Sequence, residues 1–198
     1  MKVVALLSSG IDSPVAIHLV ASKGAEVYPL HFKQDDVKEN KVRRIVKRLQ
    51  EIHGDKVKDP RIVDAFEVQG PVFEKLREIR KEKWTCIFCK YTMYIVATSY
   101  AREIKAKAIV TGDSLGQVAS QTLDNLMVMS TATELPILRP LIALDKEEIV
   151  RIAKEIGTFD ISTEKEPPCP FVPRFPVVRA GLGEFRKILN EVKDLLPK

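Results

Sequence analysis

Residues 2–14 read KVVALLSSGIDSP, and their pattern indicates the kind of fold that the chain adopts. Its apolar half has the continuous hydrophobicity of a strand that is buried on both faces of a sheet. The polar half is short and rich in small residues. Pro14 then stands in the first turn of an expected helix, where a missing N–H group costs nothing. A strand that passes through a tight turn into a helix is the first half of a β-α-β unit.

The rest of the chain repeats this alternation. We expect strands over residues 2–8, 25–32, 62–68, 108–112 and 137–141. We expect helices over residues 14–23, 37–53, 72–83, 91–104, 121–129, 145–156 and 183–196, with Asp145 and Glu148 forming a capping box. Right-handed crossovers then give an α/β fold, a doubly wound parallel sheet with helices on both faces. In such folds the ligand lies at the carboxyl ends of the strands.

Composition sets the broad class. The 198 residues suit a single domain over 1–198, and 45% hydrophobic with 30% charged residues indicates a globular protein. No apolar run is long enough for a membrane helix, so we expect a cytoplasmic protein without membrane contact. The net charge of +5 permits a polyanionic partner without requiring one. Scarce Asn and Gln beside abundant Lys and Glu favour a thermophilic source.

The turn at residues 8–14 is suited to phosphate. Small residues let successive N–H groups point toward one spot, and the helix N-terminus adds its positive end. Ser8, Ser9 and Ser13 offer hydroxyl donors. The Gly-Lys-Ser/Thr ending of a Walker A loop is missing. From the residues alone, an ordinary turn with Asp12 or Ser13 as the helix cap is an equally good interpretation.

Two further stretches give the turn a specific resemblance. The turn itself resembles the PP-loop, SGGxDS, of the N-type ATP pyrophosphatases, with Ser9 in place of the first glycine. Residues 111–126, TGDSLGQVASQTLDNL, and residues 136–162, PILRPLIALDKEEIVRIAKEIGTFDIS, closely resemble the tRNA 4-thiouridine synthetase family. The resemblance covers nearly the whole chain. It implies an adenine nucleotide alpha hydrolase-like fold and an enzyme that adenylates a tRNA uridine, releases pyrophosphate and replaces the oxygen by sulfur.

The same resemblance implies the residues of the site. The catalytic candidates are Asp12, Lys146 and Cys169, with Asp12 also a candidate for holding Mg²⁺. The candidates for binding ATP are Ser8, Ser9, Gly10, Asp12, Ser13, His31, Phe32, Gly112, Asp113 and Gln117. Arg139 is a weaker candidate for contact with phosphate or RNA.

The cysteines pose a separate question. The odd number of cysteines argues against a disulfide framework. Cys86 and Cys89 form a CxxC, and Cys169 lies in a Pro-rich segment, residues 162–181, that we expect to be a stiff functional loop. We expect the three sulfurs to converge beside the nucleotide crevice, with a helix N-terminus favouring the Cys86 and Cys89 thiolates. They could hold a [4Fe–4S] cluster, as in archaeal-type relatives, or Zn²⁺ with a fourth ligand, or Cys169 could carry a persulfide.

The expected partners follow from what the stretch 1–198 contains. We expect a stand-alone catalytic domain without the THUMP and rhodanese domains of longer members of the family. The tRNA would then be held by the basic surface or by a separate RNA-binding subunit, and the sulfur donor would be another molecule. A homodimer is one candidate assembly. The alternatives are adenylation of a small molecule or of a sulfur-carrier protein, and a nucleotide-binding subunit of a larger complex.

Overall fold

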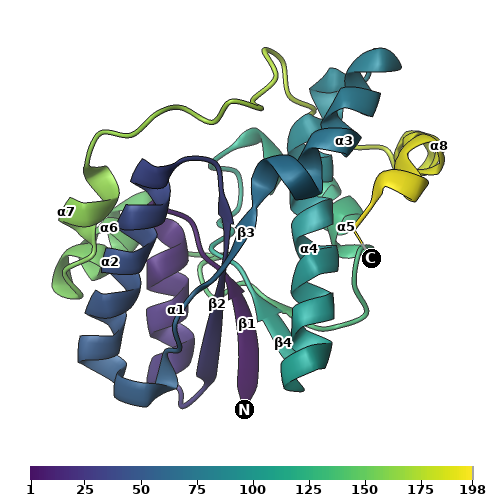
Figure 1. The fold of residues 1–198 in the computed structure, drawn as a ribbon. Helices are drawn as coiled ribbons and strands as arrows, with labels where there is room; N and C mark the ends of the chain where they lie inside the picture. Colours follow the sequence, from purple (N-terminus) through teal and green to yellow (C-terminus); the bar gives the residue numbers. More distant parts are fainter. Residues whose placement is uncertain (198) are drawn as a thin grey trace.

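Five parallel strands form one sheet in the order β3-β2-β1-β4-β5 in the computed structural model, which describes residues 1–197 (Figure 1). The strands are β1 (Lys2–Leu6), β2 (Glu26–Lys33), β3 (Arg61–Asp64), β4 (Ala108–Val110) and β5 (Ile137–Leu138). β1 is central: Val4 is paired with Tyr28 of β2 on one side and with Ile109 of β4 on the other. The expected doubly wound α/β fold is confirmed.

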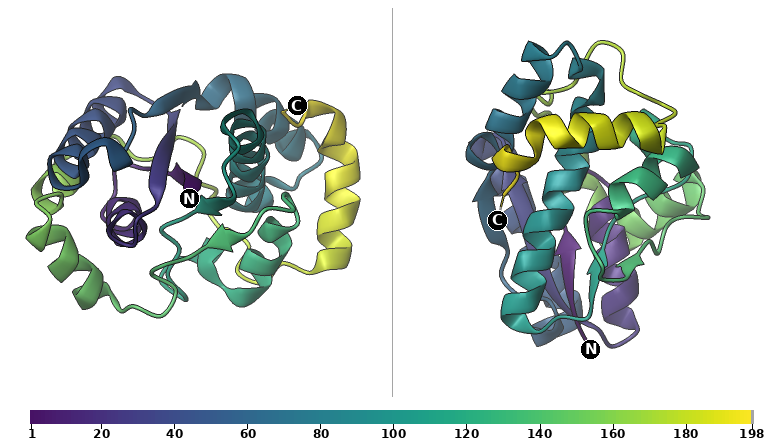
Figure 2. Two further views of the ribbon diagram at one scale, coloured as in Figure 1. Left: turned by 90° about the horizontal axis from the view of Figure 1, so that it is seen from below. Right: turned by 90° about the vertical axis from the view of Figure 1, so that its right-hand side faces the viewer.

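Helices cover both faces of the sheet (Figures 1 and 2). One face carries α1 (Asp12–Ser22), α2 (Asp36–His53), α6 (Lys146–Glu155) and α7 (Phe159–Thr163). The other carries α3 (Ala65–Glu78), α4 (Thr85–Ile104), α5 (Leu123–Ser130) and α8 (Leu182–Val192). Short 3-10 turns are η1 (Gly54–Lys56), η2 (Glu82–Trp84), η3 (Ala119–Gln121) and η4 (Lys193–Leu195). None of the helices within residues 1–197 is both long and apolar enough to cross a membrane.

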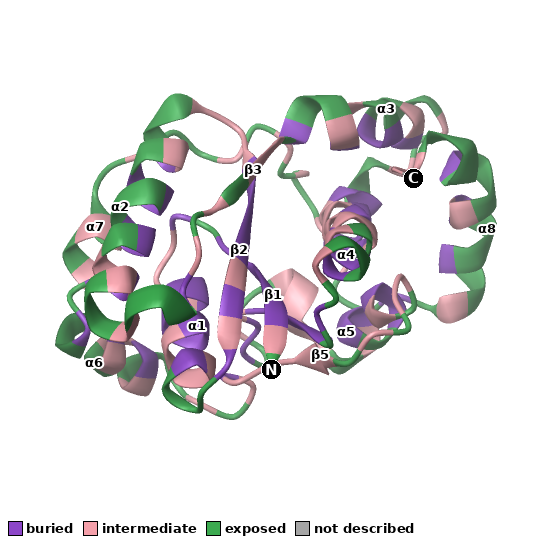
Figure 3. Cartoon of the chain, turned by 60° about the horizontal axis from the view of Figure 1, so that its bottom comes forward, coloured by how far each residue is buried: buried purple, intermediate pink, exposed green. Residues whose placement is uncertain are grey.

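The alternation of side chains along β1 separates two hydrophobic cores. Val3 and Ala5 are fully buried on the side of α1 and α2. Val4 and Leu6 are buried on the opposite side, among the side chains of α4. Figure 3 shows the same division, with the buried parts of α1, α2 and α4 turned toward the sheet. A strand that is buried on both faces reads as a continuous apolar run, which is why residues 3–7 predicted it.

Several local predictions differ from the structure. β3 ends at Asp64, because its carboxylate caps α3 by accepting from the backbone N–H groups of Phe66 and Glu67. The expected strand over 62–68 is therefore wrong beyond residue 64. α4 starts at Thr85 rather than at residue 91, which places Cys86 and Cys89 inside the helix. α7 was not predicted. The capping box of Asp145 and Glu148 is confirmed. The loop expected over residues 162–181 begins two residues later, because α7 extends to Thr163, and residues 164–181 form no regular element.

Candidate active site

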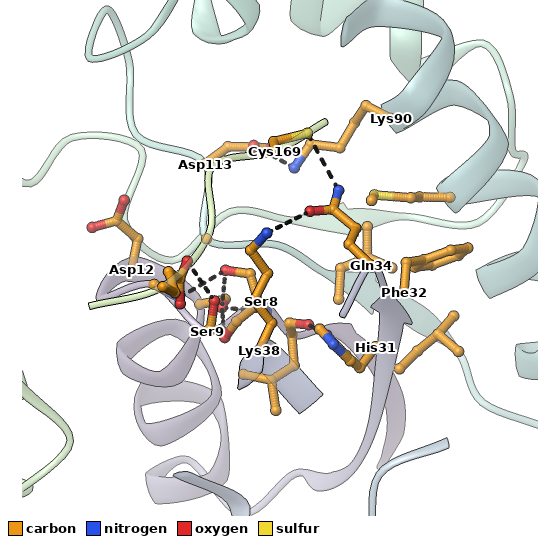
Figure 4. Close-up of a pocket in the computed structure, with 18 of the residues that line it drawn as sticks. Ser8, Ser9, Asp12, His31, Phe32, Gln34, Lys38, Lys90, Asp113 and Cys169 are labelled. Atoms are coloured by element: carbon orange, nitrogen blue, oxygen red, sulfur yellow. Dashed lines mark hydrogen bonds and ion pairs between the residues drawn. The ribbon is translucent and has the colours of Figure 1, made fainter. Parts of the chain in front are cut away.

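The strand order reverses between β1 and β4, and a pocket of about 510 Å³ lies there, outside the carboxyl ends of the strands (Figure 4). It brings together residues from six separate segments of the chain. Of the residues predicted from the sequence, the pocket is lined by Ser8, Ser9, Gly10, Asp12, Ser13, His31, Phe32, Gly112, Asp113 and Cys169. Gln117 lies outside this pocket, in a neighbouring groove.

The phosphate loop closes on itself through its serines. Ser13 Oγ accepts the backbone N–H of Ser8 at 2.9 Å and lies 3.1 Å from Ser8 Oγ. The N-cap of α1 is Ile11, which gives no side-chain cap. The interpretation of Asp12 or Ser13 as the helix cap is therefore wrong. Without a side-chain cap, the helix N-terminus keeps its positive end available to an anion.

Gly112 is required by packing. A Cβ atom at this position would lie 2.7 Å from the backbone nitrogen of Ser13 and 2.9 Å from the carbonyl carbon of Asp12. The end of β4 therefore touches the backbone of the phosphate loop, and a larger residue would displace that loop. Gly112 holds the loop in place at the same time as it lines the pocket.

Asp12, which lines both the pocket and the neighbouring groove, forms an ion pair with Lys146, which lines the groove. Lys146 Nζ lies 2.5 Å from Asp12 Oδ1, although 134 residues separate the two in sequence. Lys146 is the first residue of α6, where a cation faces the unfavourable positive end of the helix dipole. The Asp12 carboxylate compensates that cost, and an anionic ligand would do the same.

His31 and Phe32 form the apolar end of the pocket. His31 is buried, and its Nδ1 lies 2.9 Å from the Leu7 carbonyl, to which it must donate. Nε2 is then an acceptor, and it has no hydrogen-bond partner among the described residues. Burial lowers the pKa of His31, so the imidazole is neutral at pH 7. A neutral ring beside Phe32 suits an adenine base.

Asp113 is committed to an internal network rather than free for a ligand. Lys90 Nζ lies 3.1 Å from its Oδ1, and the Thr111 hydroxyl donates to its Oδ2 at 2.7 Å. Arg139 lies 3.5 Å from Oδ2 and also donates to Ser130, so it faces inward rather than toward RNA. Burial raises the pKa of Asp113, but Lys90, Thr111 and Arg139 together lower it by more. The carboxylate therefore stays ionised.

Lys90 was not predicted from the sequence, although it directly follows the CxxC. Burial lowers the pKa of Lys90, but the Asp113 carboxylate, with smaller contributions from other neighbours, raises it by more. The side chain lines the pocket as a permanent cation (Figure 4). Its position directly after Cys89 was the sequence signal that could have identified it as a site residue.

A second group of unpredicted residues surrounds Cys169. Gln34 Nε2 donates to Cys169 Sγ at 3.3 Å, and Lys38 donates to Gln34 Oε1 at 3.1 Å (Figure 4). Lys38 lies in the first turns of α2 and is nearly buried. Asp35 caps α2 and also pairs with Lys38 at 2.9 Å. These contacts join the end of β2 to the loop that carries Cys169.

The three cysteines do not form the expected metal centre. Among residues 1–197, no three His, Cys, Asp or Glu side chains are grouped as metal ligands. Cys169 lines the pocket, whereas Cys86 and Cys89 lie on the first turns of α4 and do not. Cys169 nevertheless contributes to the raised pKa values of Cys86 and Cys89, so the three thiols lie in one region of the protein. The residues as arranged do not fit a shared cluster or zinc ion.

The expectation of stabilised thiolates at Cys86 and Cys89 is also wrong. Burial raises the pKa of Cys89 to about 12, and burial together with the charge of Cys169 raises that of Cys86. Because α4 starts earlier than predicted, the Cys89 thiol packs against the hydrophobic core and accepts a hydrogen bond from Gln69 at 3.3 Å. Loss of water outweighs the helix dipole at these positions.

The fold, the uncapped helix N-terminus and the loop over Ser8–Ser13 define a nucleotide-binding domain of the PP-loop, adenine nucleotide alpha hydrolase class. A nicotinamide mononucleotide (NMN) synthetase of Francisella tularensis has the same fold, with a TM-score of 0.53 and 14% identity over 98% of this chain and 81% of that one.

The family model described as "Thiamine biosynthesis protein (ThiI)" matches residues 1–193, so the chain belongs to the ThiI family. A relative from Thermococcus kodakarensis, named "Probable tRNA sulfurtransferase", is 52% identical over 94% of this chain and 49% of its own length. A relative of the same name from Methanocaldococcus jannaschii is 50% identical over 97% of this chain and 50% of its own.

Among solved structures, a 4-thiouridine synthetase–RNA complex with bound ATP superposes with a TM-score of 0.88 at 35% identity. The match covers 98% of this chain and 51% of that chain. The chain thus spans about half the length of the curated relatives that it matches.

Proposed function

We propose that this chain is an ATP-dependent tRNA sulfurtransferase that forms 4-thiouridine. The observation that carries the proposal is that Asp12 and Cys169, from two distant segments, line one phosphate-loop pocket, while Lys146, from a third segment, lines the adjoining groove and pairs with Asp12. Membership of the ThiI family supports it, as do relatives named tRNA sulfurtransferase and the similarity to a 4-thiouridine synthetase in complex with RNA and ATP.

In the first step the pocket aligns ATP with the uridine. The adenine lies against His31 and Phe32, and the phosphates lie over the loop at residues 8–13. The uridine O4 attacks the α-phosphorus, the bond to the β-phosphate oxygen breaks, pyrophosphate leaves, and the N3 proton of the uracil passes to water. Lys146, Lys90 and the N-terminus of α1 stabilise the developing negative charge. Asp12 is the carboxylate that would hold Mg²⁺, which would supply further charge neutralisation.

In the second step sulfur replaces the activated oxygen. We assign the sulfur to Cys169 because its thiol is the one that lines the pocket. The outer sulfur of a Cys169 persulfide attacks C4, and AMP leaves with the oxygen. A second thiol then attacks the Cys169 sulfur and frees the 4-thiouridine as a disulfide forms, which an external thiol must reduce. Cys86 is the candidate second thiol. No step is assigned to a metal centre.

The test measures AMP, pyrophosphate and 4-thiouridine separately. With tRNA, ATP and a persulfide donor, we expect all three products. Asp12→Ala and Lys146→Ala should lose at least a hundredfold in AMP formation, in the range of a lost electrostatic group. Cys169→Ala should keep tRNA-dependent AMP formation and lose 4-thiouridine. The control is Asp194→Ala, since Asp194 is exposed in η4.

The substrate is tested by replacing the tRNA. Free uridine nucleotides and the C-terminus of a sulfur-carrier protein are offered in turn, with AMP as the readout. AMP formation that depends on either of these and not on tRNA would refute the tRNA substrate while leaving the adenylating activity in place. Binding of tRNA should weaken as salt is added, because contacts to phosphate release counterions.

A further inference from the structure

A second groove, of about 840 Å³, adjoins the ATP pocket. The two share Asp12 and Gln121, so they meet at the phosphate loop. The groove has two walls, residues 115–121 before α5 and residues 142–146 before and at the start of α6. It lies on the Lys146 side of the Asp12–Lys146 ion pair.

The walls of this groove are held by backbone hydrogen bonds. Leu115 N donates to the Ile142 carbonyl at 3.2 Å, which ties one wall to the other. Gly116 N donates to the Gln121 carbonyl at 2.9 Å, and the turn requires the positive φ of 75° that Gly116 adopts. Leu115 and Val118 remain 46% and 55% exposed, although both are apolar. The groove therefore combines a fixed shape with apolar surface that a flat ring could cover.

Gln117 offers one defined polar atom to the groove. The Ser114 hydroxyl donates to the Leu144 carbonyl at 3.0 Å, so its oxygen is left only as an acceptor. Gln117 Nε2 is 3.0 Å from that oxygen and must be the donor. The amide orientation is thus fixed by the network, and Gln117 Oε1 is left as an acceptor without a partner among residues 1–197. A ligand with a ring N–H group would complete this site.

We infer that this groove holds the uracil ring of the acceptor nucleotide, with Gln117 Oε1 accepting the N3–H group. The inference rests on the proposed function and deepens it, since it assigns the base to a site. The acceptor oxygen must reach the α-phosphate from outside the ATP pocket, and this groove borders the phosphate loop through Asp12. Uracil has an N3–H donor, whereas N3 of cytosine is an acceptor and would face Gln117 Oε1 with a lone pair.

Photocrosslinking locates the base without requiring turnover. A short RNA with a single 4-thiouridine is irradiated with the whole chain and ATP, and the adducts are mapped by peptide mass spectrometry. We expect adducts within residues 115–121 or 142–146. Adducts elsewhere, such as at the exposed Val172 or Phe175, or no adduct at all, would overturn the groove as the base site.

Binding tests the role of Gln117. Two RNAs are compared that carry uridine or N3-methyluridine at the acceptor position, with RNA affinity in the presence of a non-hydrolysable ATP analogue as the readout. The unmodified protein should prefer uridine about tenfold, as expected for one hydrogen bond. In Gln117→Ala this preference should shrink toward one, while ATP affinity stays within about twofold of the unmodified protein. Gln50→Ala is the control, because Gln50 lies on α2 and bonds only Val57 and Asp59.

Failure of this inference can be distinguished from failure of the proposed function. An unchanged preference in Gln117→Ala would overturn this inference and leave the proposed function intact. If AMP formation never depends on RNA, the proposed function fails, and crosslinking still decides whether the groove binds the base.

Discussion

The Ser9 hydroxyl donates to Glu166 Oε1 at 3.0 Å, which joins the phosphate loop to the loop of Cys169. The two residues are 157 positions apart in the sequence. The other oxygen of Glu166 accepts from Lys41 Nζ at 2.6 Å. Lys41 is only 2% exposed and also donates to the carbonyls of Ser162 and Glu164. One buried lysine therefore fixes the loop that carries the pocket thiol.

Replacing Lys41 should loosen that loop. Lys41→Met leaves two carbonyls and Glu166 Oε2 without their donor, and we expect a loss of roughly 3 kcal/mol in the free energy of unfolding. Limited proteolysis should cut within residues 162–171 sooner than in the unmodified protein. Urea denaturation measures the first effect. Lys47→Met is the control, since Lys47 is exposed on the same helix. Equal stability in the two variants would show that Lys41 does not hold the loop.

Gly112→Ala tests the contact between β4 and the phosphate loop. The added Cβ would meet the backbone of Ser13 at 2.7 Å, so the loop must shift. We expect a loss of about 1–3 kcal/mol in stability, as for other overpacked sites, and at least tenfold weaker ATP binding. Calorimetry and ATP titration measure these two effects.

The matched control is Gly183→Ala in α8. Its Cβ would meet no atom within 4 Å, so we expect a gain of about 0.5–1 kcal/mol and unchanged ATP binding. If Gly112→Ala also binds ATP normally, the close approach is not what shapes the loop.

The Asp113–Lys90 pair should make stability depend on pH. The pKa of Asp113 is lowered in the folded protein, so its ionised form stabilises the fold above the ordinary value of 3.8. That contribution is lost as pH falls through the lower folded-state pKa. Asp113→Asn should therefore cost roughly 3 kcal/mol at pH 7 and progressively less in acid. Urea midpoints across pH 3–7 measure the difference. A difference that is independent of pH would indicate lost hydrogen bonding rather than lost charge.

The cysteines should differ in reactivity. With a pKa of about 12, only about one Cys89 thiol in ten thousand is ionised at pH 8. Alkylation of Cys89 by iodoacetamide should therefore be slow at pH 8 and rise about tenfold per pH unit to pH 10. Cys169, which lines the pocket, should be modified first. Peptide mass spectrometry gives the rate at each site. Rapid labelling of Cys89 at pH 8 would contradict its burial.

Local sequence patterns determined the layout of this protein. The apolar run at residues 3–7 required a strand that is buried on both faces, and the small polar residues after it required a tight turn into α1. Asp145 and Glu148 predicted the start of α6, because a capping box depends only on residues three apart. Parallel strands place their carboxyl ends on one edge, so the meeting of residues 8–13 with Asp113 also followed from the pattern.

The use of these residues depends on tertiary contacts. Asp113 is neutralised by Lys90, Asp12 is paired with Lys146, and Gln117 faces the second groove instead of the ATP pocket. Each outcome depends on contacts between segments far apart in the sequence, whose distances no local pattern encodes. The pKa values of the Cys86 and Cys89 thiols could not be predicted from local sequence either. Their pKa values are set by how deeply α4 is packed, and that depth exists only once α4 lies against the sheet and α3.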